Sequence, residues 1–282
     1  MKFLNSTNQS VCQNLWDPSS RTFSSDMLKI TAVITMLMDH IGAGIISNFI
    51  YAGSSFSERT LSILIYTYQI LRLLGRISFP IFCFLLVEGF LHTHSRLKYA
   101  GNLLIFAFLS ELPFDYLFFG DFTLSSQNVF WTLLIGLLTL WCIESILNLK
   151  GNILLKNIAL LVSITAGMTV SVLLHTDYSW MGILLISCLY LFKRNPALQC
   201  TFSCILFFLS LTLRHLSNFS SLKEAVLYTF DTEWTIILAF LMIFHCNGRR
   251  YIKGGKYFFY AFYPLHLILL AILLRLLLHL IS

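Results

Sequence analysis

Asp39 and His40 interrupt the first long apolar run of the chain, which begins at Leu28. A charge inside a bilayer costs several kcal/mol, so an ionisable residue within a membrane span is a functional hypothesis, with a side chain expected to face the interior. Histidine suits general-base chemistry near neutral pH. Lys29 precedes His40 by eleven residues, which is three helical turns plus roughly 20°, or about 16 Å of rise. We therefore expect Lys29 at the membrane interface and His40 on the same helix face, about halfway across.

Asp39 is the second candidate catalytic group. A carboxylate beside a histidine can set the tautomer of the ring and stabilise the imidazolium. Adjacent residues on a helix point about 100° apart, so Asp39 reaches His40 only if the helix is broken at Gly42. Otherwise Asp39 pairs with a basic residue such as Arg72 or Arg76. The competing structural interpretation makes Asp39 and His40 hydrogen-bonding groups that hold helices together.

Further polar residues mark the ends of later apolar runs. Glu88 and His92 are four residues apart and are expected to pair on one helix face. Arg96 and Lys98 form a basic loop directly afterwards, and Arg249 lies in a second basic loop. Lys and Arg are the donors that suit phosphate. These three basic residues are candidates for binding a phosphorylated cytosolic cofactor, although a basic loop ordinarily only sets the orientation of the chain.

Two more polar groups accompany prolines. Glu111 and Asp115 flank Pro113 on one helical turn, where they could recognise an amine or a sugar hydroxyl. Ending the helix is their simpler role. His266 follows Pro264, which frees backbone carbonyls inside the last apolar run. For His266 a structural role and a functional role are both open.

The composition fixes the class of fold. The 282 residues are 57% hydrophobic and only 11% charged, against about 25% charged in a soluble domain. The apolar runs of roughly 15 to 20 residues suit helices that cross a hydrocarbon core of about 30 Å. The sequence therefore predicts an all-α, polytopic transmembrane helical bundle with a polar cytoplasmic segment over residues 1–27 and one membrane domain over 28–282. No apolar signal peptide precedes the first run, and no nucleic-acid binding is expected.

Nine spans account for the apolar runs, at residues 28–50, 76–92, 99–119, 128–147, 153–174, 179–192, 197–213, 233–246 and 257–280. Most of the 19 Lys and Arg residues fall in cytoplasmic segments if the N-terminus is cytoplasmic, so the chain obeys the positive-inside rule. We expect a bacterial cytoplasmic (inner) membrane and an external C-terminus. The run 61–75 is apolar but short, and a tenth span there would invert every later loop. We expect an interfacial or re-entrant helix instead.

The seven cysteines include no CxxC pair and are expected to be free thiols, and no metal site is expected. The chain also lacks a P-loop, a GxSxG nucleophile motif, an HExxH motif and a dinucleotide fingerprint. These absences argue against ATPase, classical hydrolase, metalloprotease and Rossmann chemistry.

A series of motifs resembles the TraX family of integral membrane proteins, whose named member acetylates the N-terminus of conjugative pilin. The similarity runs from about Leu28 to about Leu270. The matching motifs are Met38-Asp39-His40-Ile41-Gly42, Leu71-Arg72, Arg76-Ile-Ser-Phe-Pro80, Val87-Glu88-Gly89-Phe90, Ser110-Glu111-Leu-Pro113-Phe-Asp115, Gln127-Asn128, Asp177-Tyr178-Ser-Trp180-Met-Gly182, Asn247-Gly248-Arg249 and Tyr263-Pro264-Leu-His266.

The TraX family is in turn similar to membrane acyltransferases that modify cell-surface sugars. This resemblance implies transfer of an acetyl group from cytosolic acetyl-coenzyme A (acetyl-CoA) to an amine or hydroxyl at the outer side, on a peptide, a glycan or a lipid. His40 would be the catalytic base. Lys29 has the place of the family's basic residue in the first span, and Arg96 and Lys98 have the place of residues that meet coenzyme A.

Acyl transfer also needs a donor for the developing oxyanion. Arg72, Arg76 and a backbone N–H near Pro80 are candidates. Two other functions stay open. In a proton-coupled secondary transporter the ionisable residues would form a relay, but the chain has no detectable inverted repeat. A noncatalytic assembly factor for a pilus or envelope complex would tolerate replacement of Lys29 and His40.

Overall fold

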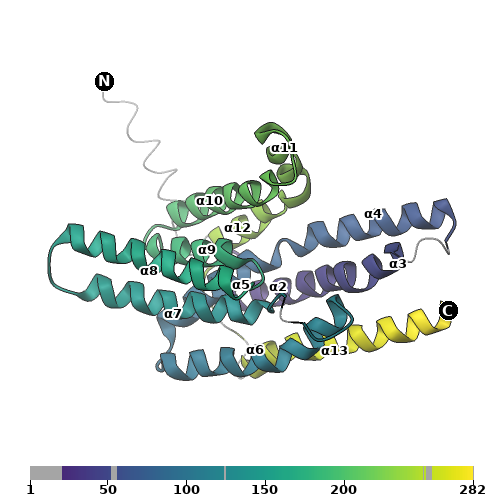
Figure 1. The fold of residues 1–282 in the computed structure, drawn as a ribbon. Coiled ribbons are helices and arrows are strands. Elements are labelled where there is room, and N and C mark those ends of the chain that lie inside the picture. Colours follow the sequence, from purple (N-terminus) through teal and green to yellow (C-terminus); the bar gives the residue numbers. More distant parts are fainter. Residues whose placement is uncertain (1–20, 52–55, 124, 250, 252–255, 282) are drawn as a thin grey trace.

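The computed structural model describes residues 21–51, 56–123, 125–249, 251 and 256–281. Most of the predicted polar segment 1–27 lies outside these residues. The described residues form helices and two isolated bridges, Phe23 with Cys246 and Gln127 with Thr176, so the all-α fold is confirmed (Figure 1). In chain order the helices are α2 (Ser25–His40), the π-helix η2 (Ile41–Ile46), α3 (Ser47–Tyr51), α4 (Glu58–Gly75), α5 (Ser78–His92), α6 (Arg96–Phe118), α7 (Val129–Asn148), α8 (Ile153–Leu173), α9 (Ser179–Leu191), α10 (Pro196–Leu216), α11 (Leu222–Glu233), α12 (Ile236–Phe244) and α13 (Lys256–Ile281).

Serine and asparagine residues in the loops fix where the helices begin. The side chain of each capping residue accepts a hydrogen bond from a backbone N–H of the first turn, which would otherwise have no acceptor. The capping residues are Ser24, Ser57, Ser95, Asn128, Asn152, Asn195 and Ser221. Polar caps at the ends of apolar runs therefore set the helix boundaries.

Seven helical segments of the described chain are long and apolar enough to cross a membrane: Ser25–Tyr51, Glu58–His92, Arg96–Phe118, Val129–Asn148, Ile153–Leu173, Pro196–Leu216 and Phe258–Leu280. An eighth is obtained if α11 and α12, which bend by 60° at their junction, form one span. The remaining predicted span, 179–192, is the 13-residue helix α9, whose length of about 20 Å is short for a bilayer. The protein is a multi-pass membrane protein.

The run 61–75 differs from the prediction of a separate interfacial or re-entrant helix. It forms most of α4, which continues through a short turn into α5, so that Glu58–His92 is one segment of 35 residues. Two basic residues at the end of this run and directly after it form ion pairs inside the bundle. Arg72 pairs with Asp39, and Arg76 pairs with Glu233.

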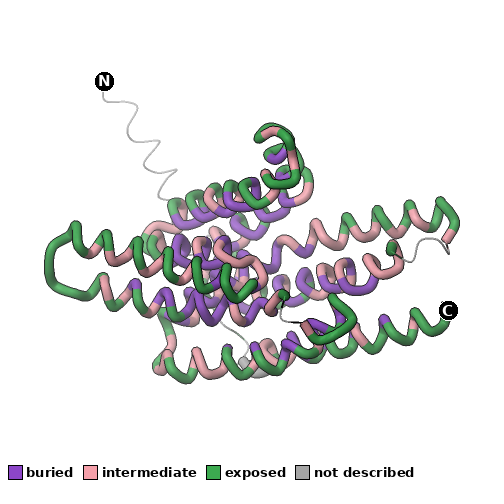
Figure 2. The backbone as a smooth tube through the Cα atoms, viewed as in Figure 1, coloured by how far each residue is buried: buried purple, intermediate pink, exposed green. Residues whose placement is uncertain are grey.

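Helices α5, α7 and α9 form the centre of the bundle. Most of their residues are buried, and α9 buries nine of its thirteen residues. Helix α8 lies at the periphery against α7 and α9 (Figure 1). Ser171 is its one buried residue, and large aliphatic side chains such as Leu161 and Leu173 are exposed (Figure 2). In a membrane protein such a face contacts lipid, which is as apolar as the side chains themselves.

The first span changes its helical pitch directly after His40. Residues Ile41–Ile46 form a π-helix, with Gly42 and Gly44 on its buried side. A Cβ atom on Gly42 would lie 3.1 Å from the Leu71 Cβ atom, so glycine lets α4 pack closely here. π-Helical turns are rare and occur often at functional sites. The helix is therefore irregular, though unbroken, at the position where the sequence places its candidate base.

Candidate active site

His40 contacts a second histidine that the sequence does not place beside it. The His40 Nδ1 atom lies 2.7 Å from the Nε2 atom of His266, which comes from α13. The two rings are parallel, with centroids 4.9 Å apart and planes inclined by 7°. Both side chains are buried, and Phe118 and Tyr263 pack edge-on against the His40 ring.

The hydrogen bonds of this pair define its tautomers. The Nδ1 atom of His266 lies 2.8 Å from the Phe262 carbonyl oxygen, which can only accept, so this nitrogen carries the hydrogen. A neutral imidazole has one N–H, and the His266 Nε2 atom therefore accepts a hydrogen bond from the Nδ1–H of His40. This leaves the Nε2 atom of His40 with a free lone pair, as a general base requires.

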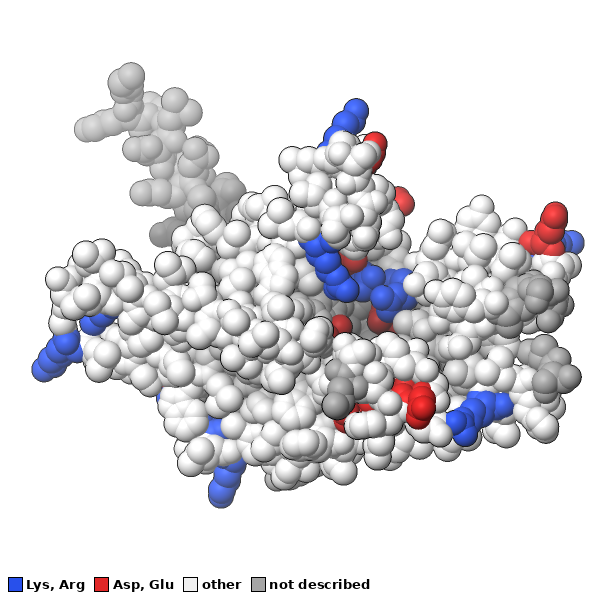
Figure 3. All heavy atoms as spheres, viewed as in Figure 1, with Lys and Arg blue, Asp and Glu red and all other residues white. Residues whose placement is uncertain are grey.

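His40 borders a cavity of about 650 Å³, here called the Arg72 cavity. In Figure 3 acidic and basic side chains gather in a hollow between α10–α11 and α4. The cavity is lined by Asp39, His40, Ala43, Arg72, Arg76, Phe114, Phe118, Phe119, Asp177, Tyr178, Leu211, Arg214, His215, Ser217, Asn218 and Glu233. It lies where α6 and α10 end and α9 begins, so it opens toward one end of the bundle.

Asp39 serves Arg72 and not His40. The Asp39 Oδ2 atom accepts a hydrogen bond of 2.7 Å from the guanidinium of Arg72, which confirms the prediction that Asp39 pairs with a basic residue if the helix stays intact. A Cβ atom on Gly75 would overlap the Asp39 side chain, so only glycine lets α4 approach this carboxylate so closely. Arg76 makes a second ion pair, 3.0 Å from Glu233.

Two more charged residues of the Arg72 cavity have no ion pair within 4 Å among the described residues. Asp177 precedes α9, and Arg214 ends α10; the two attract each other from a longer distance. Burial raises the pKa of the Asp177 carboxyl, and the nearby Asp39 carboxylate adds to this rise. The backbone is strained at this point, because Tyr178 and Ser179 both have positive φ angles. Strained residues persist where the surrounding structure holds them, often at ligand sites.

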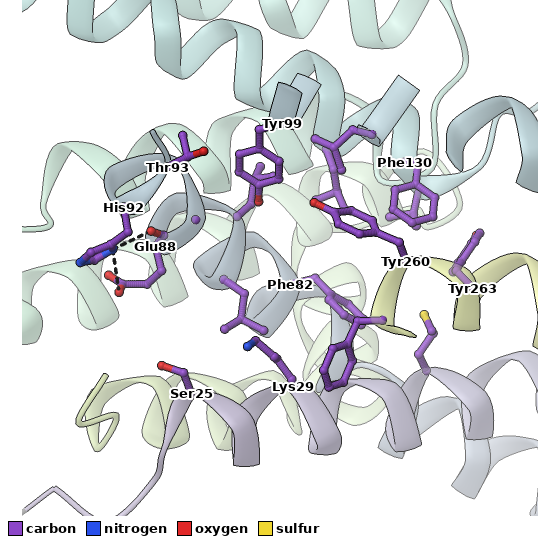
Figure 4. Close-up of a pocket in the computed structure, with 18 of the residues that line it drawn as sticks. Ser25, Lys29, Phe82, Glu88, His92, Thr93, Tyr99, Phe130, Tyr260 and Tyr263 are labelled. Atoms are coloured by element: carbon purple, nitrogen blue, oxygen red, sulfur yellow. Dashed lines mark hydrogen bonds and ion pairs between the residues drawn. The ribbon is translucent and has the colours of Figure 1, made fainter. Parts of the chain in front are cut away.

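A second cavity, of about 500 Å³, begins at Lys29 and is called the Lys29 cavity (Figure 4). Its polar residues lie at one end and its apolar residues at the other. The polar residues are Ser25, Lys29, Glu88, His92, Thr93, His94 and Tyr99. The other residues of the lining are Met36, Phe82, Leu85, Leu86, Gly89, Leu103, Val129, Phe130, Leu133, Phe259, Tyr260 and Tyr263. The Lys29 ammonium lies 3.2 Å from Asp26 and over the ring of Phe259.

The two cavities approach each other from opposite ends of the bundle. The Lys29 cavity lies where α2 and α6 begin and α5 ends, whereas the Arg72 cavity lies where α6 and α10 end. Tyr263 lines the first cavity and His40 lines the second, and their rings are in contact, with centroids 5.8 Å apart. A layer of His40, His266 and Tyr263 thus separates the cavities.

The predicted cofactor-binding residues divide into two groups. Lys29, Glu88 and His92 line the Lys29 cavity. The predicted pairing of Glu88 with His92 is confirmed, with 3.8 Å between a Glu88 oxygen and the His92 Nδ1 atom. Arg96 instead forms an ion pair with Glu144 and stacks on Phe90, with its guanidinium 4.4 Å from the ring centroid. Lys98 and Arg249 are exposed. None of the residues Arg96, Lys98 and Arg249 therefore lines either of the two cavities described.

Glu111 and Asp115 lie together on α6, away from the linings of both cavities. One Glu111 oxygen accepts hydrogen bonds from Asn128, at 2.5 Å, and from the Trp131 indole, at 2.9 Å. Asp115 accepts one from the Thr123 backbone. These contacts join α6 to α7 and to the loop between them, while the other oxygen of each carboxylate is buried without a hydrogen-bond partner among the described residues.

The sequence did not indicate several residues of the site. Arg214 and Glu233 stand at the ends of predicted spans and resemble ordinary interface residues. Asp177 and Tyr263 belong to motifs that carried the family resemblance, which was the one available signal for them. The six described cysteines are free thiols, as predicted, and Cys12 lies outside the described residues. The described residues contain no group of three or more His, Cys, Asp or Glu placed to bind a metal ion.

The fold and the site define a class: a multi-pass, all-helical membrane protein with a buried histidine pair between two cavities. The family model described as "TraX protein" matches residues 24–274. The chain belongs to the TraX family, which confirms the resemblance seen in its motifs. It is also 29% identical over 257 residues, 88% of this chain and 94% of the relative, to "Probable fimbrial assembly protein FimC, serogroup H1" of Dichelobacter nodosus. No solved structure gives a significant match.

Proposed function

We propose that the protein is a membrane-embedded acyltransferase of the bacterial cytoplasmic membrane. It moves an acetyl group from cytosolic acetyl-CoA to an amine or hydroxyl at the outer side, on a pilin-like N-terminus or a surface glycan. The observation that carries this proposal is the position of His40. His40 lines the Arg72 cavity and keeps a free Nε2 lone pair, while its ring contacts Tyr263 in the wall of the Lys29 cavity.

The Lys29 cavity suits the acyl donor. Its apolar walls fit the pantetheine arm, and Lys29, His92 and His94 at its polar end offer donors to phosphate. The nucleotide end would remain outside the cavity, and the exposed residues Lys98 and Arg249 are further basic groups for its phosphates. The predicted orientation places this mouth in the cytoplasm, the compartment in which acetyl-CoA is made.

The Arg72 cavity suits the acceptor. It carries three carboxylates and three guanidinium groups, so it can bind a polar or charged group at the outer side. Asp39 pairs with Arg72, and Glu233 pairs with Arg76. Asp177 and Arg214 are therefore left to hold the acceptor. A cationic amine would pair with Asp177, and a hydroxyl would accept from Arg214.

In the proposed reaction the acceptor's nitrogen or oxygen attacks the thioester carbonyl carbon. His40 Nε2 removes the proton of the attacking group as the new bond forms. The Nδ1–H···Nε2 bond to His266 keeps the His40 ring in the correct tautomer. When the C–S bond breaks, the imidazolium returns the proton to the departing sulfur, so His40 ends each cycle unchanged.

A second candidate function is a noncatalytic assembly factor for a pilus or fimbria. The name of the relative from Dichelobacter nodosus favours it. The two proposals are compatible in the cell, because modification of a pilus subunit is itself a step in making a pilus. They differ in the activity expected of the purified protein, because an acyltransferase transfers acetyl groups on its own and a noncatalytic assembly factor does not.

The test is transfer from radiolabelled acetyl-CoA by the purified protein in lipid nanodiscs. Coenzyme A release and label on acceptor peptides, glycans and lipids are followed for the parent, His40→Ala and the control His245→Ala. His245 is also a histidine, but it lies at the end of α12, outside both cavities. We expect His40→Ala to reduce transfer by about 10²–10⁴-fold while His245→Ala keeps it.

Absence of coenzyme A binding and of transfer in the parent would refute the acyltransferase proposal. Pilus assembly that survives His40→Ala in cells would then favour the assembly factor. Proton-dependent solute uptake into vesicles would instead favour the transporter.

A further inference from the structure

The hydroxyl of Tyr263 is buried without a hydrogen-bond partner among the described residues. The side chain is only 3% exposed. A buried hydroxyl that makes no hydrogen bond has lost its contacts with water without replacement and destabilises the fold, so its retention calls for an explanation. A phenylalanine would fill the same space at no such cost.

The position of Tyr263 suggests what the hydroxyl serves. Tyr263 lines the apolar end of the Lys29 cavity, and its ring contacts both His40 and His266. Phe259 and Tyr260, one turn earlier on α13, belong to the same cavity wall. Tyr263 is not in the lining of the Arg72 cavity, so the Lys29 cavity is the ligand space that it borders.

A second donor approaches the same point. Val129, which lines the cavity, is the first residue of α7. The N–H groups of a first helical turn have no acceptor within the helix and lie at its positive end. The Val129 N–H lies close enough to act on the Tyr263 oxygen, but the two form no well-oriented hydrogen bond. Two donors therefore converge beside the histidine pair.

We propose that the Tyr263 hydroxyl, supported by the Val129 N–H, is the oxyanion-stabilising group of the acyl transfer. This inference rests on the proposed function. As the acceptor attacks, the carbonyl π electrons move onto the oxygen, which receives a hydrogen bond from Tyr263. When the carbonyl re-forms, the C–S bond breaks and sulfur leaves with the electron pair. Tyr263 keeps its proton throughout, and the acceptor's proton passes by way of His40 to the thiolate.

The arginines that the sequence offered for this role are engaged elsewhere. Arg72 and Arg76 pair with Asp39 and Glu233, and both line the Arg72 cavity. A donor for the thioester oxygen must reach the cavity that holds the thioester. Tyr263 meets that condition.

The test compares Tyr263→Phe with Tyr66→Phe, the same change at an exposed position of α4 that lines neither cavity. Loss of one oxyanion donor costs about 10²–10³-fold in kcat. We expect Tyr263→Phe to lower kcat by this factor with little change in the KM for acetyl-CoA, and Tyr66→Phe to leave kcat within a few-fold of the parent. Infrared spectra of bound acetyl-CoA labelled with ¹³C at the carbonyl should show a stretch shifted to lower frequency that Tyr263→Phe abolishes.

The outcomes separate the two proposals. A parent protein that transfers no acyl group refutes the proposed function. A parent that is active and whose Tyr263→Phe variant keeps full kcat, with an unchanged carbonyl stretch, overturns the oxyanion role alone. Thermal unfolding of each variant in detergent shows whether a loss of rate reflects a loss of fold.

Discussion

His40 and His266 are 226 residues apart in the chain, yet their rings share one proton across 2.7 Å. Because His266 is anchored to the Phe262 carbonyl, it can only accept from His40. In the proposed mechanism His266 has the orienting role that a carboxylate has in a catalytic triad, without bringing a charge into the membrane, where a carboxylate would be costly.

Replacement of His266 tests this orienting role. The amide oxygen of His266→Gln can still accept from the His40 Nδ1–H, whereas His266→Met fills similar space and offers only a weak acceptor. We expect His266→Gln to keep a measurable fraction of the transfer rate and His266→Met to lose about 10²-fold or more. The measurement is kcat in nanodiscs, with thermal unfolding as the control for folding. Equal rates for the two variants would contradict the orienting role.

Gly75→Ala tests the packing of α4 against Asp39. The added methyl group would overlap the Asp39 side chain and force it away from Arg72, at a cost of about 1–3 kcal/mol. Gly101→Ala is the control, because a Cβ atom there meets nothing within 4 Å and alanine favours a helix by up to about 1 kcal/mol. Thermal unfolding in detergent should show a lower Tm for Gly75→Ala and an equal or higher Tm for Gly101→Ala. A Gly75→Ala variant as stable as the parent would contradict the packing argument.

Lys29 and Arg96 should differ in what their loss affects. Lys29→Ala removes a donor from the mouth of the Lys29 cavity and the contacts with Asp26 and Phe259, so we expect the KM for acetyl-CoA to rise about tenfold together with a modest fall in Tm. Arg96→Ala breaks contacts with Glu144 and Phe90, so it should lower stability by about 1 kcal/mol and leave the KM unchanged. Steady-state kinetics and thermal unfolding of both variants decide this. A rise in KM for Arg96→Ala alone would restore Arg96 as a coenzyme-binding residue.

Asp177 should make stability depend on pH. Its pKa is raised in the folded protein, so the ionised carboxylate destabilises the fold above that pKa, and the cost disappears as the pH falls through it. Each pKa unit corresponds to about 1.4 kcal/mol. Asp177→Asn should therefore have a higher Tm than the parent at about pH 8, with a smaller difference at acidic pH. Asp231→Asn, at an exposed position of α11, should show no such trend.

Composition and charge pattern were enough to predict the class of fold, because apolar runs and polar caps are local features. They placed the breaks near Ser95, Asn128 and Asn152 within a few residues. The run 61–75 was expected to be a separate helix because it is short and a tenth span would invert every later loop, whereas α4 continues into α5 as one segment of 35 residues. Asp39 and Glu233, the partners of Arg72 and Arg76, lie far away in the sequence, and only the folded bundle shows the neutralised pairs.

The candidate site was predictable in part for the same reason. His40 stands out as an ionisable residue in an apolar run, and the angle between adjacent helical residues correctly separated it from Asp39. Its real partner, His266, was found as a polar residue beside Pro264, but nothing local joins α2 to α13. Arg96 shows the opposite error, since a basic residue after a span suggests phosphate binding until Glu144 and Phe90 are seen around it.

The layer of His40, His266 and Tyr263 has a consequence for the energy balance of the cell. Bacteria store energy as a proton gradient across the cytoplasmic membrane, and a continuous water-filled path would dissipate it. The aromatic layer keeps the Lys29 and Arg72 cavities apart. In the proposed mechanism one acyl group passes outward and one proton of the acceptor passes inward to the thiol, so proton entry is limited to one per acyl group transferred and no open leak forms.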